Sequence, residues 1–199
     1  MKREAEIKTL LINNTIHLIA MGDFEKATTK ELTHSSGDSL GIKMNEAYIY
    51  RLFGSKENLY EAAFIYLDNE IFYAFRRGIE AVGGFAQDFK DKFYQFFLLA
   101  WEFILANEKY FKFYVRFYHS IYFKEHSLQS HKKLFERLAA EMAPFFKEEA
   151  DVVSILHIVS SALLDFGIRV YNGDLEDGDI NTPHIFNVLY CMMATYFKE

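Results

Sequence analysis

The chain has 199 residues, of which 51% are hydrophobic and only two are proline, so it can bury a full core and suits long helices. Its net charge of −6 argues against a protein that coats nucleic acid without specificity; residues 1–60 carry eight basic and eight acidic side chains, so the acidic excess lies beyond them. The single cysteine, Cys191, excludes an intrachain disulfide, and the first residues form no apolar signal segment, so we expect a cytoplasmic protein.

Two helices are predicted before residue 40. Apolar residues recur at helical spacing from Ile7 to Ile19, which predicts a helix from about Glu4 to Met21, ended by Gly22. Thr28 is expected to cap a second helix, because Glu31 follows at the spacing of a capping box and can reach back to the Thr28 N–H.

Two further helices are predicted to meet at Gly54. Asn45 is a good N-cap for a short helix that Gly54 ends, and Ser55 is expected to cap the long helix that follows. On the short helix, the predicted inward stripe is Ala47, Ile49, Tyr50 and Phe53, and the predicted exposed residues are Glu46, Tyr48 and Arg51.

The start of the long helix suits an anion. Its first turn presents free backbone N–H groups at Ser55 beside Lys56, a layout that binds phosphate. Lys56 is otherwise a solvated lysine, but a cation is mildly unfavourable at a helix N-terminus, and a phosphate partner would explain its presence there.

The run Tyr50-Arg51-Leu52-Phe53-Gly54-Ser55-Lys56-Glu57-Asn58-Leu59 resembles the Y-x-x-F-x-S-K-E-x-L signature of TetR-type transcriptional regulators. Gly22, Phe24 and Thr28 also match, in type, the turn that precedes the second helix in that family. The resemblance implies that the Thr28 hydroxyl contacts a phosphate as well as capping its helix. It also implies a helical dimer that holds an effector cavity.

The chain departs from the family pattern between Thr33 and Met44. Ser36-Gly37-Asp38-Ser39 stands where the turn between the two DNA-reading helices belongs, yet the expected tyrosine comes about six residues late. Either the turn is a long loop, or the recognition helix starts early and Leu40-Gly41-Ile42 serves as a substitute turn. Which side chains reach base edges is left open by this insertion.

Beyond Ser55, apolar spacing carries one helix to about Ala81, where Gly83 and Gly84 stop it. A helix of that length leading out of a DNA-binding head is a candidate mechanical link to the following part.

Aromatic residues are dense from Phe85 to Phe123, with sixteen Phe, Tyr and Trp side chains at helical spacings and Asn107 as an expected cap between two helices. Most such rings pack the core. A subset is expected to line a cavity for a small apolar or aromatic effector, and the candidates are Phe93, Phe97, Trp101, Phe113, Phe117 and His119.

Another amphipathic helix is predicted from Gln129 to Phe146. After it, residues 152–170 repeat apolar side chains at alternating spacings of four and three, and a last helix starting at Thr182-Pro183 is apolar on more than one face. Two such helices suggest a four-helix interface between two copies. Its expected members are Val152, Leu156, Val159, Leu163, Phe166, Phe186, Tyr190 and Met193.

Motifs for enzyme chemistry are absent from the sequence: it holds no phosphate-binding glycine loop, H-E-x-x-H or C-x-x-C. Glu31 and His34 form a lone E-x-x-H, far short of the ligands that a di-iron bundle needs. We therefore expect no metal, no cofactor and no enzyme activity. The most apolar run, residues 152–170, is interrupted by charged residues, so we expect no membrane span.

The sequence as a whole predicts an all-α homodimer of about nine helices per chain. Residues 1–54 form a three-helix DNA-binding head, and residues 55–199 form an effector-binding and dimerisation part. It is expected to bind a near-palindromic operator and to release it when the effector binds. The predicted DNA contacts are Thr28, Lys43, Asn45, Glu46, Tyr48, Tyr50, Arg51, Ser55 and Lys56.

Two alternatives remain open. In one, the insertion after Ser39 abolishes or alters DNA recognition, and the chain is a helical effector-binding or partner-binding protein. In the other, the aromatic pocket houses a cofactor-free enzyme, for which no constellation of catalytic residues speaks.

Overall fold

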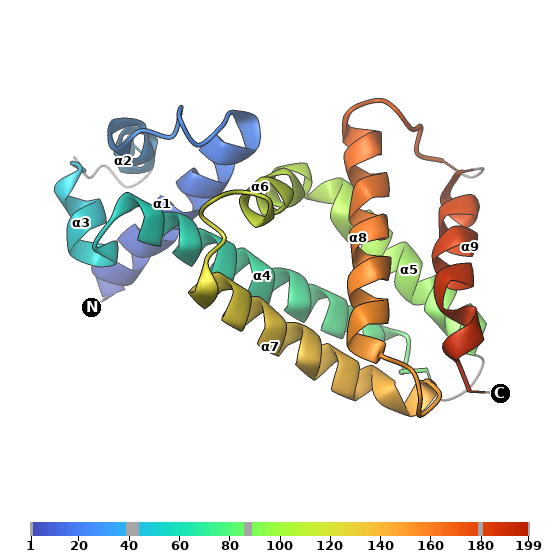
Figure 1. Ribbon diagram of the computed structural model, residues 1–199. Coiled ribbons are helices and arrows are strands. Elements are labelled where there is room, and N and C mark those ends of the chain that lie inside the picture. Colours follow the sequence, from blue (N-terminus) through green and yellow to red (C-terminus); the bar gives the residue numbers. More distant parts are fainter. Residues whose placement is uncertain (1, 39–43, 86–88, 179–180, 199) are drawn as a thin grey trace. The chain divides into compact units, whose positions relative to one another are not determined.

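The computed structural model describes residues 2–38, 44–85, 89–178 and 181–198. Within these ranges the chain folds into nine α-helices with two short 3₁₀ turns and no strand, so the predicted all-α class is confirmed (Figure 1). In order they are α1 (Lys2–Met21), α2 (Thr29–Asp38), α3 (Ala47–Phe53), α4 (Lys56–Ala81), α5 (Phe89–Ala106), α6 (Glu108–Tyr118), α7 (Glu125–Met142), η1 (Ala143–Phe145), α8 (Val152–Tyr171), α9 (Asn181–Met193) and η2 (Ala194–Tyr196).

The helices group into two compact units. The first comprises Met1–Glu70 and Lys109–Ser130, and the second comprises Ile71–Glu108 and His131–Glu199. Helices α4 and α7 therefore each contribute residues to both units. This grouping follows packing, whereas the division at residue 54 is a prediction about function and stays one.

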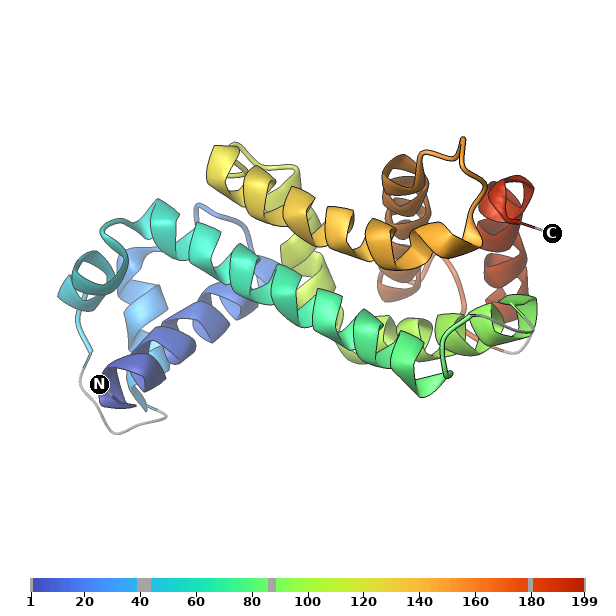
Figure 2. The ribbon, with the colours of Figure 1, turned by 90° about the horizontal axis from the view of Figure 1, so that it is seen from below.

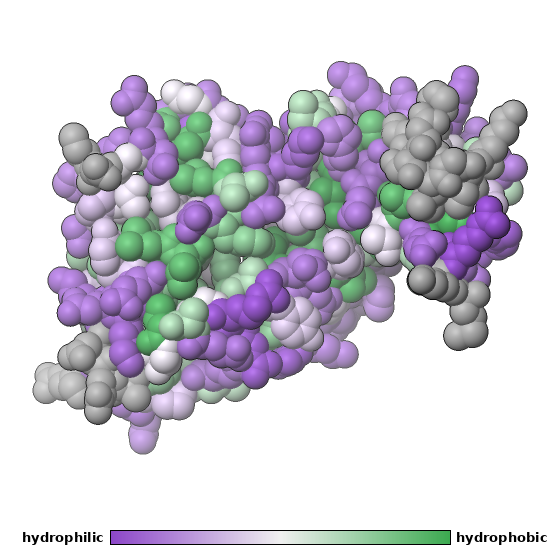
Figure 3. Space-filling view, turned by 180° about the vertical axis from the view of Figure 1, so that it is seen from behind, coloured by the Kyte–Doolittle hydropathy of each residue, from purple (hydrophilic) through white to green (hydrophobic). Residues whose placement is uncertain are grey.

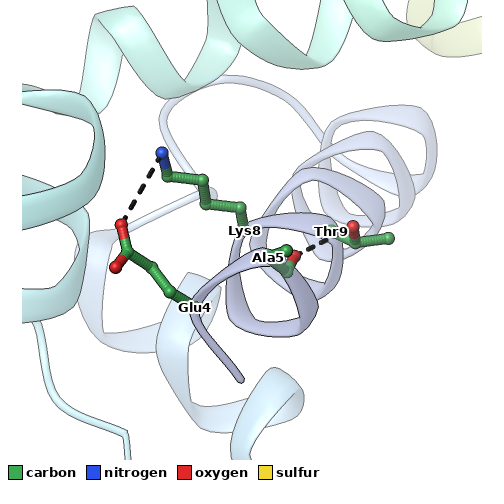
Figure 4. Close-up of polar contacts among 4 residues, drawn as sticks. All are labelled: Glu4, Ala5, Lys8 and Thr9. Carbon is green, nitrogen blue, oxygen red and sulfur yellow. Dashed lines mark hydrogen bonds and ion pairs between the residues drawn. The ribbon is translucent and has the colours of Figure 1, made fainter. Parts of the chain in front are cut away.

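The first unit is built around side chains that α1, α2, α3 and α4 bury together. Leu11, Leu32, Ile49 and Leu59, one from each helix, are fully buried. The outer face of α1 is polar: Lys8 Nζ lies 3.9 Å from Glu4 Oε1, and the Thr9 hydroxyl donates to the Ala5 carbonyl at 3.1 Å (Figure 4). The amphipathic spacing of α1 thus places its apolar stripe inward.

Helices α4 and α7 lie side by side in both ribbon views (Figure 2). In the first unit, the Ser127 hydroxyl and N–H both donate to Glu61 Oε1, at 3.0 and 3.1 Å. In the second unit, Arg76 Nε lies 3.8 Å from Glu141 Oε1. Within each unit, therefore, a polar contact holds α7 against α4.

The second unit has an aromatic core. Phe93, Phe97 and Trp101 are buried on α5, and Phe186 of α9 packs against Phe97 with ring centroids 5.5 Å apart. Helices α5 and α8 approach closely at Gly167, where an added Cβ would stand 2.7 Å from Ile104 Cγ2. The Tyr171 hydroxyl donates to the Ile104 carbonyl and fixes the same contact.

Backbone hydrogen bonds join the segments that follow α7 and α9. Phe146 and Phe197 form an isolated antiparallel bridge, flanked by the Lys147 N–H donating to the Tyr196 carbonyl at 2.8 Å and the Lys198 N–H donating to the Phe145 carbonyl at 3.0 Å. Phe146 is buried against Phe197, with ring centroids 4.8 Å apart. Residues some fifty positions apart in sequence are therefore held together.

Candidate nucleic-acid interface and effector cavity

Thr28 begins α2 as the sequence predicts. Its hydroxyl oxygen accepts from the Glu31 N–H at 3.3 Å, which satisfies one of the free donors of the first turn. The predicted return bond is different: the Glu31 carboxylate accepts from the Thr28 hydroxyl at 3.3 Å, and the Thr28 N–H instead donates to the Lys26 carbonyl at 2.9 Å. Thr28 is exposed at this helix start.

The start of α3 differs from the prediction. The N-cap is Glu46 rather than Asn45, and it has helical backbone angles and no capping side-chain bond. Asn45 contributes only its carbonyl, which accepts from the Tyr48 N–H at 3.1 Å. The Glu46 carboxylate accepts from the Thr29 hydroxyl at 2.5 Å, so this predicted DNA contact links the starts of α2 and α3.

The inward and outward faces of α3 also differ from the prediction at Ala47, which is exposed, and at two tyrosines. Ile49 is fully buried and sets the phase of this helix of two turns, which turns Tyr50 outward with 55% of its surface exposed. Tyr48, predicted to be exposed, is half-buried, and the Arg51 guanidinium lies 4.5 Å from its ring centroid. The exposed face therefore presents Tyr50 and Arg51. Lys43 lies outside the described residues.

The junction between α3 and α4 forms as predicted. Gly54 takes a φ of 82°, which favours glycine, and its N–H donates to the Tyr50 carbonyl at 2.9 Å. The Ser55 hydroxyl oxygen accepts from the Asn58 N–H at 3.0 Å, and the Asn58 side-chain amide donates to the Phe53 carbonyl at 2.8 Å. The end of one helix and the start of the next are thus fastened together.

The first turn of α4 stabilises negative charge. The pKa of the exposed Glu57 carboxyl is lowered, first by a hydrogen bond from its own backbone N–H, and further by the Ser55 hydroxyl and by Lys56 and Lys124. Burial opposes this lowering and is outweighed. Donors that stabilise a carboxylate here are the donors that a phosphate would use.

Contacts that the sequence did not predict hold this head in the first unit. The buried Tyr60 donates its hydroxyl to the Ala27 carbonyl at 2.9 Å, just before α2. Arg116 of α6 donates to the Ile19 carbonyl at 2.8 Å and so satisfies the last turn of α1. Sequence spacing carries no signal for either contact, because the partners lie 33 and 97 residues away.

An apolar cavity of about 60 Å³ lies within the second unit. Of the predicted effector residues, Phe93 and Phe97 line it. The complete wall consists of Phe75, Ile79, Phe93, Phe96, Phe97, Ala100, Leu138, Met142, Leu156, Val159, Ser160, Leu163, Leu189 and Met193. Ser160 is the single polar side chain among them, and none of them is ionisable at neutral pH.

The other predicted effector residues lie elsewhere. The indole N–H of Trp101 donates to Asp177 at 3.0 Å, and Trp101 borders an open surface hollow rather than the cavity. Phe113 and Phe117 are fully buried in the first unit, where their rings stack with centroids 5.9 Å apart. His119 follows α6 in that unit. The six candidates therefore lie in three places: the cavity wall, the surface hollow and the first unit.

In the part of the chain that the structure describes, no three His, Cys, Asp or Glu side chains lie together where they could hold a metal ion.

Solved TetR-family regulators match this structure over nearly their whole length. A TetR family transcription regulator from Marinobacter aquaeolei VT8 aligns with a TM-score of 0.72 at 14% identity, covering 96% of this chain and 97% of that chain. A putative TetR family regulator from Shewanella sp. PV-4 aligns with a TM-score of 0.74 at 14% identity, covering 97% and 99%. The chain has the TetR-family fold.

A further match is the multidrug binding protein EbrR complexed with imidazole, with a TM-score of 0.66 at 12% identity and 93% of both chains covered. No protein family model and no curated protein matches the sequence. The resemblance drawn from residues 50–59 is thus confirmed by the fold of the whole chain.

On this TetR-family fold, most predicted interface residues point into their own chain. Leu163, Phe186 and Met193 are buried, and Leu156 and Val159 line the cavity. The remaining three, Val152, Phe166 and Tyr190, are half-buried.

The outward faces of α8 and α9 carry other residues. Ile158 and Val188 are 57% and 49% exposed, and Ser161 and Cys191 are exposed beside them in the helical pattern. Figure 3 shows the face that lies behind Figure 1, where apolar residues stand exposed among polar ones. The alternating four- and three-residue spacing of apolar side chains identified an apolar face on α8. It did not show whether that face packs against its own chain or against a second copy.

Proposed function

We propose that the chain is a ligand-responsive DNA-binding transcriptional regulator of the cytoplasm. It binds a near-palindromic operator as a homodimer and acts as a repressor that an effector in the cavity of the second unit releases. The observation that carries the proposal is the exposed Tyr50 and Arg51 pair on α3, joined through Gly54 to an anion-stabilising helix start, in a chain with the TetR-family fold.

The DNA contacts divide by chemistry. Thr28, Ser55 and Lys56 stand at helix starts, where backbone N–H groups and a cation suit phosphate oxygens. Tyr50 and Arg51 are exposed on α3 and suit base edges, and arginine pairs with the two acceptors of guanine. Tyr48, Asn45 and Glu46 have structural contacts of their own and take a secondary part; Lys43 remains a proposed contact.

The effector acts through α4. Phe75 and Ile79 of this helix line the cavity, and Ser55 caps its first turn. A ligand that shifts the cavity wall therefore bears on the helix that begins at the phosphate contacts. A coupling of about 1–3 kcal/mol lowers operator affinity about 5- to 150-fold. EbrR, a protein of the same fold, is described as a multidrug binding protein and was solved with imidazole.

A second copy is proposed to cover the outward faces of α8 and α9. By length and composition alone α8 is apolar enough to cross a membrane, with a mean hydropathy of 1.6 over its most apolar window, of which 28% is buried. One such helix is weak evidence of a span, because core helices of soluble proteins pass the same test. Ile158 and Val188 supply the exposed apolar surface that dimerisation would remove from water.

The test is a titration of duplex DNA from the region flanking the coding sequence, at several stated salt concentrations. Arg51→Ala is expected to cost about 1–3 kcal/mol and to relax sequence preference, whereas Lys56→Ala weakens binding to all duplexes and lowers the salt slope by about 1. Lys132→Ala is the matched control, since Lys132 is an exposed lysine on α7 whose ammonium lies 3.8 Å from Glu136 Oε1.

Binding by wild type that Arg51→Ala and Lys56→Ala leave unchanged would reject the residue roles. Absence of any salt-dependent duplex binding would reject the regulator and favour the partner-binding alternative, in which the insertion after Ser39 abolishes DNA recognition.

A further inference from the structure

The cavity of the second unit has a wall whose chemistry restricts its ligand. Thirteen of its fourteen side chains are apolar, and they come from α4, α5, α7, α8 and α9. Transferring an ionised carboxylate or ammonium into such surroundings is costly unless an opposite charge or several hydrogen bonds receive it. The wall offers no charge of either sign, so it disfavours ionised ligands.

Ser160 is the one exception in this wall, and its hydroxyl makes no hydrogen bond to any described residue. Helical hydroxyls elsewhere in the chain bond back to the preceding turn: Thr15 donates to the Leu11 carbonyl at 2.7 Å, and Thr33 donates to the Thr29 carbonyl at 3.0 Å. Ser160 lies on α8 without such a bond, so both its donor and its acceptor are available to a ligand.

The volume of the cavity also restricts the ligand. The cavity is small, about 60 Å³, so a bulky ligand must displace part of the wall. Met142 and Met193 are the adaptable members of that wall, because methionine has three rotatable side-chain bonds and no branch. A slender alkyl chain requires less displacement than a rigid ring system.

We propose that the ligand of this cavity is an uncharged amphiphile, a slender apolar body with one alcohol or carbonyl group, whose polar group hydrogen-bonds the Ser160 hydroxyl. This inference deepens the proposed function by naming the effector class, and it rests on that function only for the consequence of binding. Binding itself is a separate property of the second unit and is measured without DNA.

The experiment titrates the full-length protein with 1-hexanol, hexanoate and hexylammonium at neutral pH, probes with one chain and three head groups. Trp101 is the only tryptophan, and its ring stacks on Phe97 of the cavity wall with centroids 6.2 Å apart, so its fluorescence reports binding; calorimetry provides a second readout. We expect 1-hexanol to bind at least about tenfold more tightly than either ion.

Ser160→Ala is expected to weaken 1-hexanol binding by about threefold to tenfold, the contribution of one neutral hydrogen bond. Ser130→Ala makes the same chemical change on α7, in the first unit and outside the cavity wall, and is expected to leave binding unchanged. Ala100→Leu fills the cavity and is expected to abolish binding of all three probes; circular dichroism checks that each variant folds.

Three outcomes overturn the inference. Hexanoate or hexylammonium binding as tightly as 1-hexanol removes the uncharged class, and unchanged 1-hexanol binding by Ser160→Ala removes the hydrogen bond. No binding of any probe to the wild type removes the cavity as a site for such ligands. DNA binding is measured in a separate duplex titration. A failure there would reject the proposed function without changing the result for ligand binding.

Discussion

At the scale of single residues, the first unit depends on polar atoms that reach across the chain. Tyr60 is the clearest case: its ring is fully buried, meets Phe24 and Tyr122 edge-on at 5.4 and 5.3 Å, and its hydroxyl satisfies the Ala27 carbonyl. That carbonyl precedes α2, so one hydroxyl connects α4 to the start of the second helix of the head.

Tyr60→Phe tests this connection. The variant keeps the ring and leaves the Ala27 carbonyl without its partner, so we expect a loss of about 1–3 kcal/mol in the free energy of unfolding, measured in urea. Tyr50→Phe removes the same atom from a side chain that is 55% exposed and is expected to change stability by less than about 0.5 kcal/mol. Equal stability of the two variants would show that the Tyr60 hydrogen bond contributes nothing.

Burial also makes stability depend on alkaline pH. Desolvation is the first cause that raises the pKa of Tyr60, Tyr66, Tyr114 and Tyr171 above the ordinary tyrosine value. Above about pH 10 the unfolded chain loses these protons while the folded chain keeps them. Stability contributed by the protonated hydroxyls is therefore present below pH 10 and lost as pH rises further.

We expect the free energy of unfolding to fall above pH 10 by up to about 1.4 kcal/mol per pH unit for each tyrosine that stays protonated. Urea melts between pH 8 and pH 12, roughly spanning the tyrosine pKa, measure the slope. The double variant Tyr60→Phe, Tyr171→Phe is expected to show a shallower slope than the wild type. A curve without slope above pH 10 would contradict the assignment.

At the scale of elements, the sequence predicts those helix ends that local chemistry sets. Gly22, Gly54 and the Gly83-Gly84 pair stand where α1, α3 and α4 end, and Ser55 caps α4 as expected. A glycine or a hydroxyl acts on its own turn, so a short window of sequence contains the whole signal.

The helix ends that were predicted wrongly depend on contacts with residues distant in the sequence. Helix α2 continues through Ser36 and Gly37 to Asp38, although these residues suit a turn. Helix α7 begins at Glu125, four residues before the predicted start, where the Ser127 bonds to Glu61 support its first turn. Tyr50 was predicted to face inward and Tyr48 outward, and the structure reverses the two. Both residues are aromatic, so only the burial of Ile49 shows which of them faces solvent.

The contact between α5 and α8 gives a prediction at this scale. Gly167→Ala would place a Cβ 2.7 Å from Ile104 Cγ2, closer than packed atoms allow, so the two helices must separate. We expect a loss of about 1–3 kcal/mol in the free energy of unfolding, although alanine favours the helix more than glycine does. Ser130→Ala, on α7 and away from both this contact and the proposed interface, is the control and is expected to be neutral or slightly stabilising. A stabilised Gly167→Ala would contradict the close approach.

At the scale of the whole molecule, the proposed dimer is the feature on which operator recognition depends. A near-palindromic operator requires two heads related by two-fold symmetry, with half-sites about 34 Å or a multiple apart. The outward faces of α8 and α9, with Ile158 and Val188, are the surface proposed to pair the copies. The sequence showed that these helices are apolar on several sides, but only the folded chain separates the inward residues from the outward ones.

The double variant Ile158→Glu, Val188→Glu tests the pairing. Carboxylates placed on both proposed interface helices face a desolvation cost and repel their symmetry mates, so we expect a monomer by sedimentation and a large loss of operator affinity. Leu128→Glu introduces the same charge at an exposed leucine of α7, 42% exposed, and is expected to leave the dimer intact. A wild-type monomer, or a double variant that still pairs, would place the interface elsewhere.

The antiparallel bridge between Phe146 and Phe197 has a dynamic consequence. The amide protons of Lys147 and Lys198 are held by carbonyls on opposite segments, so neither can meet solvent until the two segments part. In deuterated solvent the two protons should therefore exchange in step, as a single opening event, despite lying at distant places along the polypeptide.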